Sequence, residues 1–567
     1  MTQSAPEAIR KTGRSRVLVA GITPVLLVAA VATVPPARAK SQAAELLQYL
    51  SPLPEKTYLN ESQDRLIKKK RFKVGDLPDI QPVLNREVGF FALLSPGQSS
   101  DPALWNELLA REDVSGLSVI FPWRSLEPQE EEYNWKPIDE LLKAVKQHNK
   151  TLILRVSTCG LDIDGQSDSP AWVLDSNIKK VSYNGADGKS YSMPIFWDTN
   201  YLAKWNNFIK DMGERYDKNP SLHSIGITGG GIGGGTFVIP HVGSTAPENQ
   251  KATKEANDQL EETLKKEYGL NQRQIVEHWK YVADLFPQAF PTARLNFNID
   301  GPIRGRAGQD ALDEISDYLS YRYGQRVYLT RQNVSDDKHG FDQYRVMLKF
   351  HPDTFTGYQL STGIKPADFE KLSQNALEDG ISFAEIPVDI LKSNDDLVKK
   401  PLHHLLSHIG YQIVSENVSI PSEVASGEPL KASFTFKNLG AAAPMRSERA
   451  FDKDVSSSFK IQLELRDNSG KPVVLSLHTP QVPTHHWSAG TPLTWSEELR
   501  MPVGEQALKP GEYSVFLSVV DAETSRKVAF LNRLAGSKPT VSFSAPVGSL
   551  KVVPASQTVG SSQASPH

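Results

Sequence analysis

The chain has 567 residues, a formal net charge of -3, 39% hydrophobic residues and 23% charged residues. This length is sufficient for two or three domains, each with a sizeable core. The composition is that of an ordinary globular protein, and the small negative charge argues against a nucleic acid or a polyacidic partner.

The first forty residues differ from the rest of the chain. Four basic residues between positions 10 and 16 precede an apolar run over 17–34, and Ala37-Arg38-Ala39 follows as a cleavage site. This order predicts a secretory signal peptide over residues 1–39 and a secreted or periplasmic protein. The alternative is an uncleaved anchor, because the run is close to the shortest length that spans a bilayer. Only in that case do we expect a membrane partner.

Cys159 is the single cysteine, so no intramolecular disulfide can form. Neither a zinc-ligand spacing nor a phosphate-binding or dinucleotide-binding glycine motif is present. The sequence therefore predicts no metal and no organic cofactor, and we interpret Cys159 as a packing residue.

After a polar lead-in over residues 40–84, strand and helix patterns alternate. Apolar runs predict eight strands, at 88–94, 115–121, 151–157, 224–228, 294–299, 327–331, 355–360 and 381–386. Between them lie helical stripes such as Ile138, Leu141, Leu142 and Val145. Eight alternating units predict a (β/α)8 TIM barrel over 85–411, within the α/β class.

The fourth strand leads into a glycine-rich loop that begins at Gly229. Glycine permits sharp bends and close approach of a ligand to the backbone, although a flexible surface loop has the same composition. Functional sites of this fold lie at the carboxyl ends of the strands, where this loop begins.

Near Gly410 the hydrophobic period changes from that of helices to strict alternation, as in Phe459, Ile461, Leu463 and Leu465. This pattern predicts an antiparallel β-sandwich over 412–553. The last residues, 554–567, are rich in Ser, Gly and Gln, and we expect a disordered tail.

Strand five alternates apolar residues with Asn296, Asn298 and Asp300. Because helices cover the outside of a barrel, the polar row should face inward. The same argument points Arg155 on strand three and Gln359 on strand seven into the barrel. These side chains could contact substrate near the strand ends, or could form a buried network that only holds the barrel together.

Aromatic residues gather in the loops after strands two and three, among them Trp123, Trp172 and Trp197. Aromatic rings stack on the apolar faces of sugars, so these residues are candidate substrate-binding residues. Each of them could instead belong to the core.

The segments Phe121-Pro122-Trp123-Arg124-Ser125-Leu126-Glu127-Pro128 and Tyr133-Asn134-Trp135, followed by Ile138-Asp139, resemble the region after strand two in clan A glycoside hydrolases. The likeness to their β-galactosidase-like and cellulase-like barrels continues through Ser169-Pro170-Ala171-Trp172 and Tyr216-Asp217-Lys218-Asn219-Pro220. Uncharacterised bacterial proteins that join such a barrel to a C-terminal sandwich are also similar. The resemblance covers most of residues 85–553.

The resemblance implies a catalytic pair of glutamates, one after strand four and one at strand seven. This chain departs from that pattern, because small residues follow strand four and Gln359 occupies strand seven. Gln cannot act as a nucleophile or exchange a proton near neutral pH. Asp300 and Glu385 are the candidate catalytic carboxylates in their place, with Asp162 or Asp164 as a further possibility.

Glu385 also has a structural interpretation, as an ion-pair partner of Arg155 or Arg331. Arg331, at the end of strand six, is in addition a candidate substrate-binding residue. The sequence thus predicts an exported, glycan-active, glycoside-hydrolase-like protein with a carbohydrate partner. The alternative is a non-catalytic carbohydrate-binding or scaffold protein that has lost its carboxylates. A third interpretation makes the sandwich the binding part, with His485-His486-Trp487 and Trp495 as its aromatic residues.

Overall fold

The structure is a computed structural model. It describes residues 80–83, 87–95, 97–159, 167–184, 190–230, 250–299, 306–334, 354–445, 458–522, 525–534 and 539–555. The predicted signal peptide, nearly all of the lead-in and most of the predicted tail lie outside these residues. Asp162, Asp164 and Asp300 lie outside them as well.

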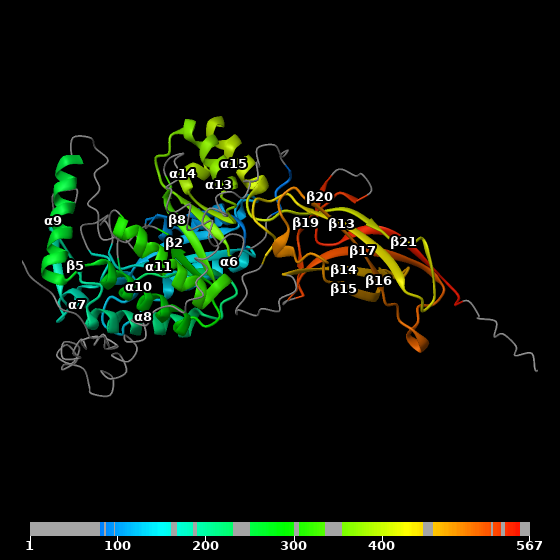
Figure 1. The fold of residues 1–567 in the computed structure, drawn as a ribbon, viewed down its shortest axis with the longest axis horizontal. Helices are drawn as coiled ribbons and strands as arrows, with labels where there is room; N and C mark the ends of the chain where they lie inside the picture. The colour runs from blue at the N-terminus through cyan, green and yellow to red at the C-terminus, as the bar shows by residue number, and fades with distance from the viewer. Residues whose placement is uncertain are drawn as a thin grey trace, which may run out of the picture. The chain divides into compact units, whose positions relative to one another are not determined.

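The predicted barrel is confirmed. Eight parallel strands close on themselves in the order β1-β10-β9-β8-β7-β6-β3-β2 (Figure 1). Their bounds are β1 Gly89–Leu93, β2 Gly116–Pro122, β3 Thr151–Ser157, β6 Leu222–Gly226, β7 Leu295–Asn298, β8 Val327–Val334, β9 Thr356–Leu360 and β10 Phe383–Pro387.

Helices surround the strands. The main ones are α4 Pro102–Ala110, α6 Lys136–Gln147, α8 Thr199–Tyr216, α10 Gln272–Ala289, α11 Arg306–Tyr323, α13 Phe369–Glu378 and α15 Asp396–His408. Asp101 caps α4, since its carboxylate accepts hydrogen bonds from the backbone N–H groups of Ala103 and Leu104. The predicted apolar stripe of α6 is buried against the barrel, as expected for an amphipathic helix.

Shorter elements extend the loops. They are α5 Trp123–Leu126, α7 Ala171–Leu174, α14 Val388–Leu391, the antiparallel hairpin of β4 Lys180–Asn184 and β5 Ser190–Pro194, and the long helix α9 Gln250–Tyr268. All of them follow barrel strands, so the insertions concentrate in the loops that carry sites on this fold.

One end of the barrel interior is aromatic. His223 lies in ring contact with Phe91, Tyr328 and Phe383. Its Nε2 lies 3.1 Å from the carbonyl oxygen of Glu87, which can only accept, so Nε2 carries the proton and Nδ1 accepts from Ser224 Oγ at 3.1 Å. A neutral imidazole therefore completes an otherwise apolar layer.

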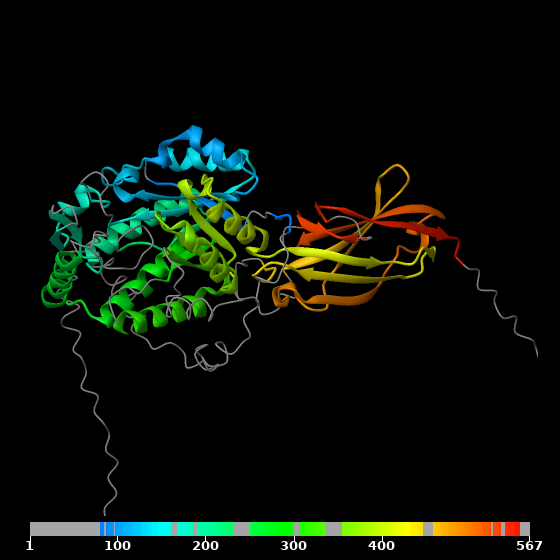
Figure 2. The same ribbon diagram turned by 90° about the horizontal axis from the view of Figure 1, so that it is seen from above.

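The C-terminal strands form two facing sheets (Figure 2). The first contains β16 Pro492–Leu499, β13 Leu430–Asn438, β11 Ile413–Ser419, β19 Phe530–Asn532 and β20 Thr540–Ser542. The second contains β12 Glu423–Ala425, β21 Ala545–Val553, β17 Gly511–Asp521, β14 Phe459–Arg466 and β15 Pro472–His478, with β18 Lys527–Val528 beside β17. The alternating residues Phe459, Ile461, Leu463 and Leu465 face the core as predicted.

The sheets differ from the prediction in one respect. Two pairs, β11 with β19 and β12 with β21, are parallel, whereas the alternation suggested an antiparallel sandwich throughout. Short hairpins impose antiparallel pairing, but these partners are joined by long stretches of chain that leave either direction open. Trp487 and Trp495 are buried at 1% and 6% exposure, so they are core residues rather than a surface platform.

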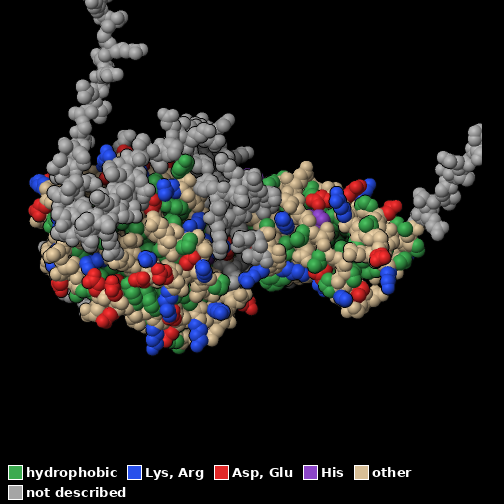
Figure 3. Space-filling model, turned by 90° about the horizontal axis from the view of Figure 1, so that it is seen from below, with side chains coloured by type: hydrophobic (Ala, Val, Ile, Leu, Met, Phe, Trp, Pro, Cys, Tyr) green, Lys and Arg blue, Asp and Glu red, His purple; other side chains and the backbone are tan. Residues whose placement is uncertain are grey.

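Within the described part of the chain, no helix is both long and apolar enough to cross a membrane. On the face drawn in Figure 3, acidic and basic side chains are intermixed over the described surface. This distribution agrees with the small net charge.

Two buried histidines predict acid sensitivity. Burial lowers the pKa of His223 and of His278, on α10, from 6.5 to about 3. Below pH 6.5 the unfolded chain therefore binds protons that the folded chain does not, and the free energy of unfolding must fall as the pH falls towards 3. Each histidine contributes a slope of up to about 1.4 kcal/mol per pH unit.

We therefore expect His278→Leu to reduce the pH dependence of unfolding between pH 6 and pH 4 by about 1 kcal/mol per pH unit. Urea titrations of the variant and the native chain across this range measure the difference, which isolates His278 from other titrating groups. Equal slopes in the two proteins would contradict the prediction.

Candidate functional site

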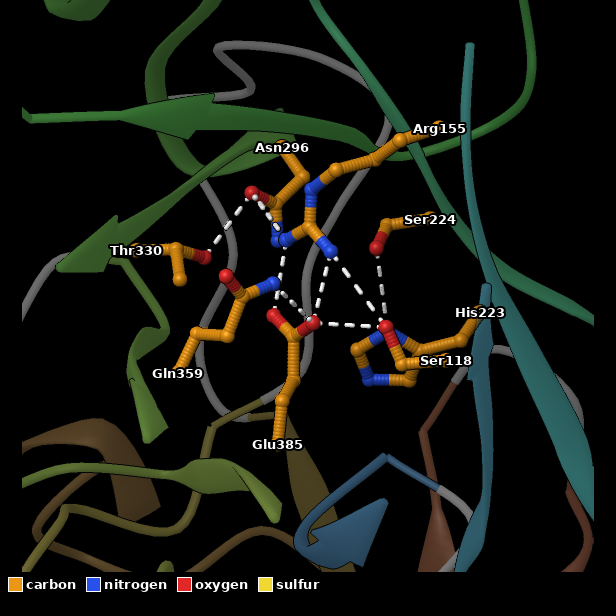
Figure 4. A network of polar contacts seen from close by, with 8 residues as sticks. All are labelled: Ser118, Arg155, His223, Ser224, Asn296, Thr330, Gln359 and Glu385. Carbon is orange, nitrogen blue, oxygen red and sulfur yellow. Dashed lines mark hydrogen bonds and ion pairs between the residues drawn. The ribbon is translucent and has the colours of Figure 1, made fainter. Parts of the chain in front are cut away.

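A buried ion pair crosses the barrel interior. Arg155 on β3 and Glu385 on β10 are joined by two parallel contacts, Nη1 to Oε2 at 2.6 Å and Nη2 to Oε1 at 2.7 Å (Figure 4). The side chains are 1% and 0% exposed. Of the two structural partners that the sequence offered for Glu385, the structure selects Arg155.

Further polar groups complete the pair. Glu385 Oε2 also accepts from Ser118 Oγ on β2 at 2.6 Å and from Gln359 Nε2 on β9 at 3.1 Å. Buried charges require such compensation, because each has lost its hydration. Glu385 thus accepts four hydrogen bonds at a position that is not exposed at the protein surface.

Asn296 on β7 links the pair to the opposite wall. Its Oδ1 accepts from Arg155 Nη2 at 3.1 Å and from Thr330 Oγ1, on β8, at 2.8 Å. These two bonds fix the orientation of the amide, so that Nδ2 is left as a donor. Nδ2 is buried and has no hydrogen-bond partner within the described structure.

Gly226, the last residue of β6, makes room for the arginine. A Cβ at this position would lie 2.6 Å from Arg155 Cγ and 3.2 Å from Cδ. Any other residue would push the guanidinium out of line with Glu385. The glycine is therefore required by side-chain packing across the barrel, and its own backbone has no unusual φ.

The next two glycines also have packing roles. A Cβ on Gly229, which has φ +139°, would lie 2.5 Å from Trp205 Nε1, and one on Gly230 would lie 2.8 Å from Phe196 Cγ. The start of the glycine-rich loop is thus constrained by aromatic neighbours. Residues 231–249 lie outside the described structure.

Two more side chains near the ends of neighbouring strands have buried polar atoms without partners. They are Thr228 Oγ1, two residues beyond the end of β6, and Gln332 Nε2, within the register irregularity of β8 between Arg331 and Val334. Both residues are at most 4% exposed. With Asn296 they form a set contributed by β7, by β8 and by the residues just after β6, which are neighbouring strands of the barrel. We call this set the unpaired polar set.

The predicted tryptophans do not form one platform. Trp123 is fully buried, with its ring packed against Trp172, Trp205 and Phe208. It has no face left for a sugar, so its predicted role in stacking is corrected to one in the core.

Trp172 and Trp197 are half-buried. The Trp172 ring carries the Lys204 ammonium 4.8 Å from its centre, and its Nε1 donates to the carbonyl oxygen of Glu127 at 3.0 Å. Trp197 Nε1 donates to the carbonyl oxygen of Tyr268 at 3.0 Å. Both indoles are thus anchored, and each retains some exposure to solvent.

The remaining predicted residues lie on different walls. Asn298 is 2% exposed and belongs to the same inward-facing row as Asn296. Arg331 does not join the ion pair, because its guanidinium lies over the Tyr358 ring at 5.6 Å. The two are register partners on β8 and β9. Gln359 contacts Glu385 directly.

The motif after strand two lies partly outside the barrel. Tyr133 and Trp135 stack with ring centres 4.9 Å apart, and Trp135 packs on Phe208 and Tyr216 of α8. Within the same motif Glu127 accepts from Trp123 Nε1 at 2.8 Å and from the Glu131 backbone N–H at 2.9 Å. Burial raises the pKa of Glu127 to about 7, although these two hydrogen bonds oppose the shift.

Sequence reasoning did not single out Ser118, Thr228, Thr330 or Gln332. Strand parity placed Asn296 in the inner row but gave it no role. The signal for Thr330 was the same parity on the next strand, while Ser118 is a small residue in an apolar run, with nothing to distinguish it. In the described residues no cluster of three or more His, Cys, Asp or Glu side chains could hold a metal ion.

Comparisons with known proteins agree with the barrel. The glycoside hydrolase 42 family model, described as beta-galactosidase, matches residues 105–229. This span contains β2, β3, β6 and the motif with Trp123 and Glu127. The barrel is glycoside-hydrolase-like. The resemblance to clan A glycoside hydrolases is thereby confirmed, while no curated protein matches the chain.

Three solved structures illustrate the similarity. The catalytic domain of beta-amylase from Paenibacillus polymyxa is 11% identical, with a TM-score of 0.42, over 57% of this chain and 99% of its own. The beta-galactosidase from Marinomonas ef1 is 13% identical, with a TM-score of 0.35, over 56% of this chain and 59% of its own. The intracellular xylanase TsXylA from Thermoanaerobacterium saccharolyticum is 11% identical, with a TM-score of 0.35, over 57% and 92%. The chain thus spans about three fifths of that beta-galactosidase.

The role of Gly226 gives a stability prediction. We expect Gly226→Ala to lower the free energy of unfolding by about 3 kcal/mol, because the new methyl group displaces Arg155 and strains the buried ion pair. Chemical denaturation measures the change. Gly97→Ala is the matched control, since nothing lies within 4 Å of the added Cβ. Equal effects of the two substitutions would contradict the packing role.

Glu127 gives a pH prediction of opposite sign to that of the histidines. With a folded pKa of about 7 and an ordinary value of 4.5, Glu127 keeps its proton between these limits only in the folded state. The stability that this proton contributes is present below pH 4.5 and is lost as the pH rises through 7.

We therefore expect the stability of Glu127→Gln relative to the native chain to rise by about 2 kcal/mol between pH 4.5 and pH 7.5. Denaturant titrations of both proteins at several pH values measure this difference. A difference that stays constant with pH would show that Glu127 ionises alike in the two states.

Proposed function

We propose that this protein binds a carbohydrate at the mouth of its barrel, where the strands end, and that it does not cleave it by the usual pair of carboxylates. The glycoside-hydrolase-like barrel supports a glycan ligand. The state of Glu385 supports the absence of cleavage.

The observation that carries the proposal is the ion pair. Within the eight barrel strands, all of which are described, Glu385 is the single acidic residue. Two guanidinium nitrogens, a hydroxyl and an amide occupy its oxygens. The Glu385 side chain is 0% exposed and held by Arg155, so a sugar cannot reach it for attack or proton transfer. In most glycoside hydrolases one carboxyl group protonates the leaving group and a second one attacks the sugar or activates a water, so both must be accessible to substrate.

The unpaired polar set supplies the binding chemistry. Thr228, Asn296 and Gln332 offer a hydroxyl and two amide N–H groups that lack partners in the described structure. Buried donors without partners are costly, and a ligand rich in hydroxyl groups would satisfy them. Asn298 and the half-buried Trp172 and Trp197 are further candidates for contact with a longer oligosaccharide.

Hydrolysis with Asp300 and Glu385 is the second candidate. Its support is the position of Asp300 in the sequence, two residues after Asn298 in a row whose earlier members face the barrel interior. It requires that substrate binding release Glu385 from Arg155.

We also propose that the protein acts outside the cytoplasm, on the strength of the signal-peptide pattern in residues 1–39.

The test is a panel of oligosaccharides incubated with the full chain, with binding followed by calorimetry and products followed by mass. We expect saturable binding of at least one glycan and no product. Product formation that is lost in Asp300→Asn or Glu385→Gln would establish the second candidate, and absence of binding to every glycan would refute the proposal.

Thr228→Val locates the ligand. Valine has nearly the same shape as threonine and removes only the unpaired hydroxyl, so the fold should be unaffected, while glycan affinity should fall about tenfold. Ser373→Ala is the matched control, because Ser373 Oγ on α13 is also buried and unpartnered. Equal affinities of the two variants would place the ligand elsewhere.

A further inference from the structure

The second sheet of the C-terminal sandwich ends in an open edge. β15 pairs with β14 on one side and is the last strand of that sheet in the described part of the chain (Figure 1). The backbone N–H and C=O groups along its outer side therefore have no strand to pair with there. Such an edge is a template for another strand, and proteins usually protect it.

The other three edge strands of the two sheets are protected. β12 and β20 have only three residues each. β16 carries Glu498 on its exposed side, and Glu497 on the same parity as the buried Trp495. Short length and charges, inward-pointing ones included, are common means of preventing edge-to-edge association. β15, in contrast, has seven residues, and none of them is Asp, Glu, Lys or Arg.

One face of β15 carries a row of exposed aliphatic side chains. Val474 and His478 point towards the sandwich core. Leu475 and Leu477 lie on the opposite face and are 61% and 53% exposed, and Val473 is 38% exposed. The pairing with β14 is irregular at Val473 and regular from Val474 to His478, so the two leucines belong to a regular stretch of strand. Adjacent exposed leucines on an open edge indicate a contact surface.

The polar groups beside the leucines do not oppose an apolar contact. Glu464 on β14 is the register partner of Leu475. Its carboxylate pairs with the side chains of Arg466 and Lys527, so no uncompensated carboxylate adjoins the row. The register partner of Leu477 is the neutral Gln462. An edge without charges of its own offers nothing to select an acidic or a basic partner.

The row is complementary to itself. If two β15 strands pair antiparallel about a twofold axis at Ser476, Leu475 lies opposite Leu477 of the partner subunit, on the same face of the joined sheet. Side chains that are directly opposite in an antiparallel pair have Cβ atoms about 5 Å apart, so the leucines of both copies form one cluster. The backbone groups of the two open edges pair at the same time.

We propose that two copies of this chain associate through β15, in an antiparallel pairing that continues the second sheet across a twofold axis. One strand and one row of side chains make a smaller contact than a standard stable interface, which buries about 1,600 Å² in total. The dimer is therefore reversible and depends on concentration. Because the pairing uses the open edge of each copy, association stops at two chains.

Sedimentation velocity of the full chain, between about 1 and 300 μM, tests the association, since weak interfaces dissociate in this range. We expect the average mass to rise with concentration from that of one chain towards that of two. A mass that stays at one chain throughout would overturn the proposal. Growth beyond two chains would overturn it as well, because the leucines would then adhere without consuming the edge.

A lysine substitution tests the assigned surface. Leu475→Lys should weaken association at least tenfold, because it puts a charge against the leucine of the partner subunit. The side chain is exposed, so the fold should be unaffected. Leu397→Lys is the matched control, since Leu397 on α15 is 58% exposed and lies outside the sandwich. Equal dissociation constants for the two variants would overturn the proposal.

Amide hydrogen exchange distinguishes strand pairing from contact between side chains alone. The amides of β15 should exchange more slowly at high than at low concentration of the native chain, and at one rate in Leu475→Lys. Exchange that is independent of concentration in a native dimer would overturn the strand pairing. Neither substituted residue belongs to the ion pair or the unpaired polar set, so the result does not depend on glycan binding.

Discussion

The interior of this barrel depends on compensating the lost hydration of one buried ion pair. An arginine and a glutamate that are removed from water lose several kcal/mol of hydration each, and their attraction offsets that loss only with near-ideal geometry and additional hydrogen bonds. Arg155 and Glu385 have both, through two parallel contacts and through Ser118, Gln359 and Asn296. Five of the eight strands contribute a side chain to this arrangement, so the pair constrains most of the barrel.

The same requirement separates two zones of the barrel. Below the pair, neutral His223 and aromatic rings fill the interior, and Arg294 near this end is paired with Glu87. At the level of the ion pair and towards the carboxyl ends of the strands, the interior contains amides and hydroxyl groups. Among them Asn296, Thr228 and Gln332 have unused hydrogen-bonding capacity. Unused capacity of this kind is costly unless something else satisfies it, and this cost is the basis for proposing a polar ligand at the mouth of the barrel.

Periodicity was enough to predict the barrel, because eight apolar runs alternated with amphipathic stripes. Parity was enough to point Arg155, Asn298 and Gln359 inward. The sequence narrowed the ion-pair partner of Glu385 to Arg155 or Arg331 but could not choose between them, since Arg155 and Glu385 are 230 residues apart. The burial of Trp123 was equally hidden: a tryptophan after a strand has the same local sequence whether its ring faces solvent or is enclosed by helices such as α8. The parallel pairings of β11 with β19 and of β12 with β21 were not predicted, because alternation reports the buried face and not the strand direction.

Gly226 has a consequence for how this barrel could change over evolutionary time. A larger residue at this position is incompatible with Arg155, and loss of either charge leaves the other buried and alone, at a cost of about 3–5 kcal/mol. Single substitutions at any of the three positions therefore lead through poorly folded intermediates. A descendant with a free catalytic glutamate on the last strand would need coordinated replacements on three strands. The three positions are thus coupled, so we expect a change at one of them to be tolerated only together with changes at the others.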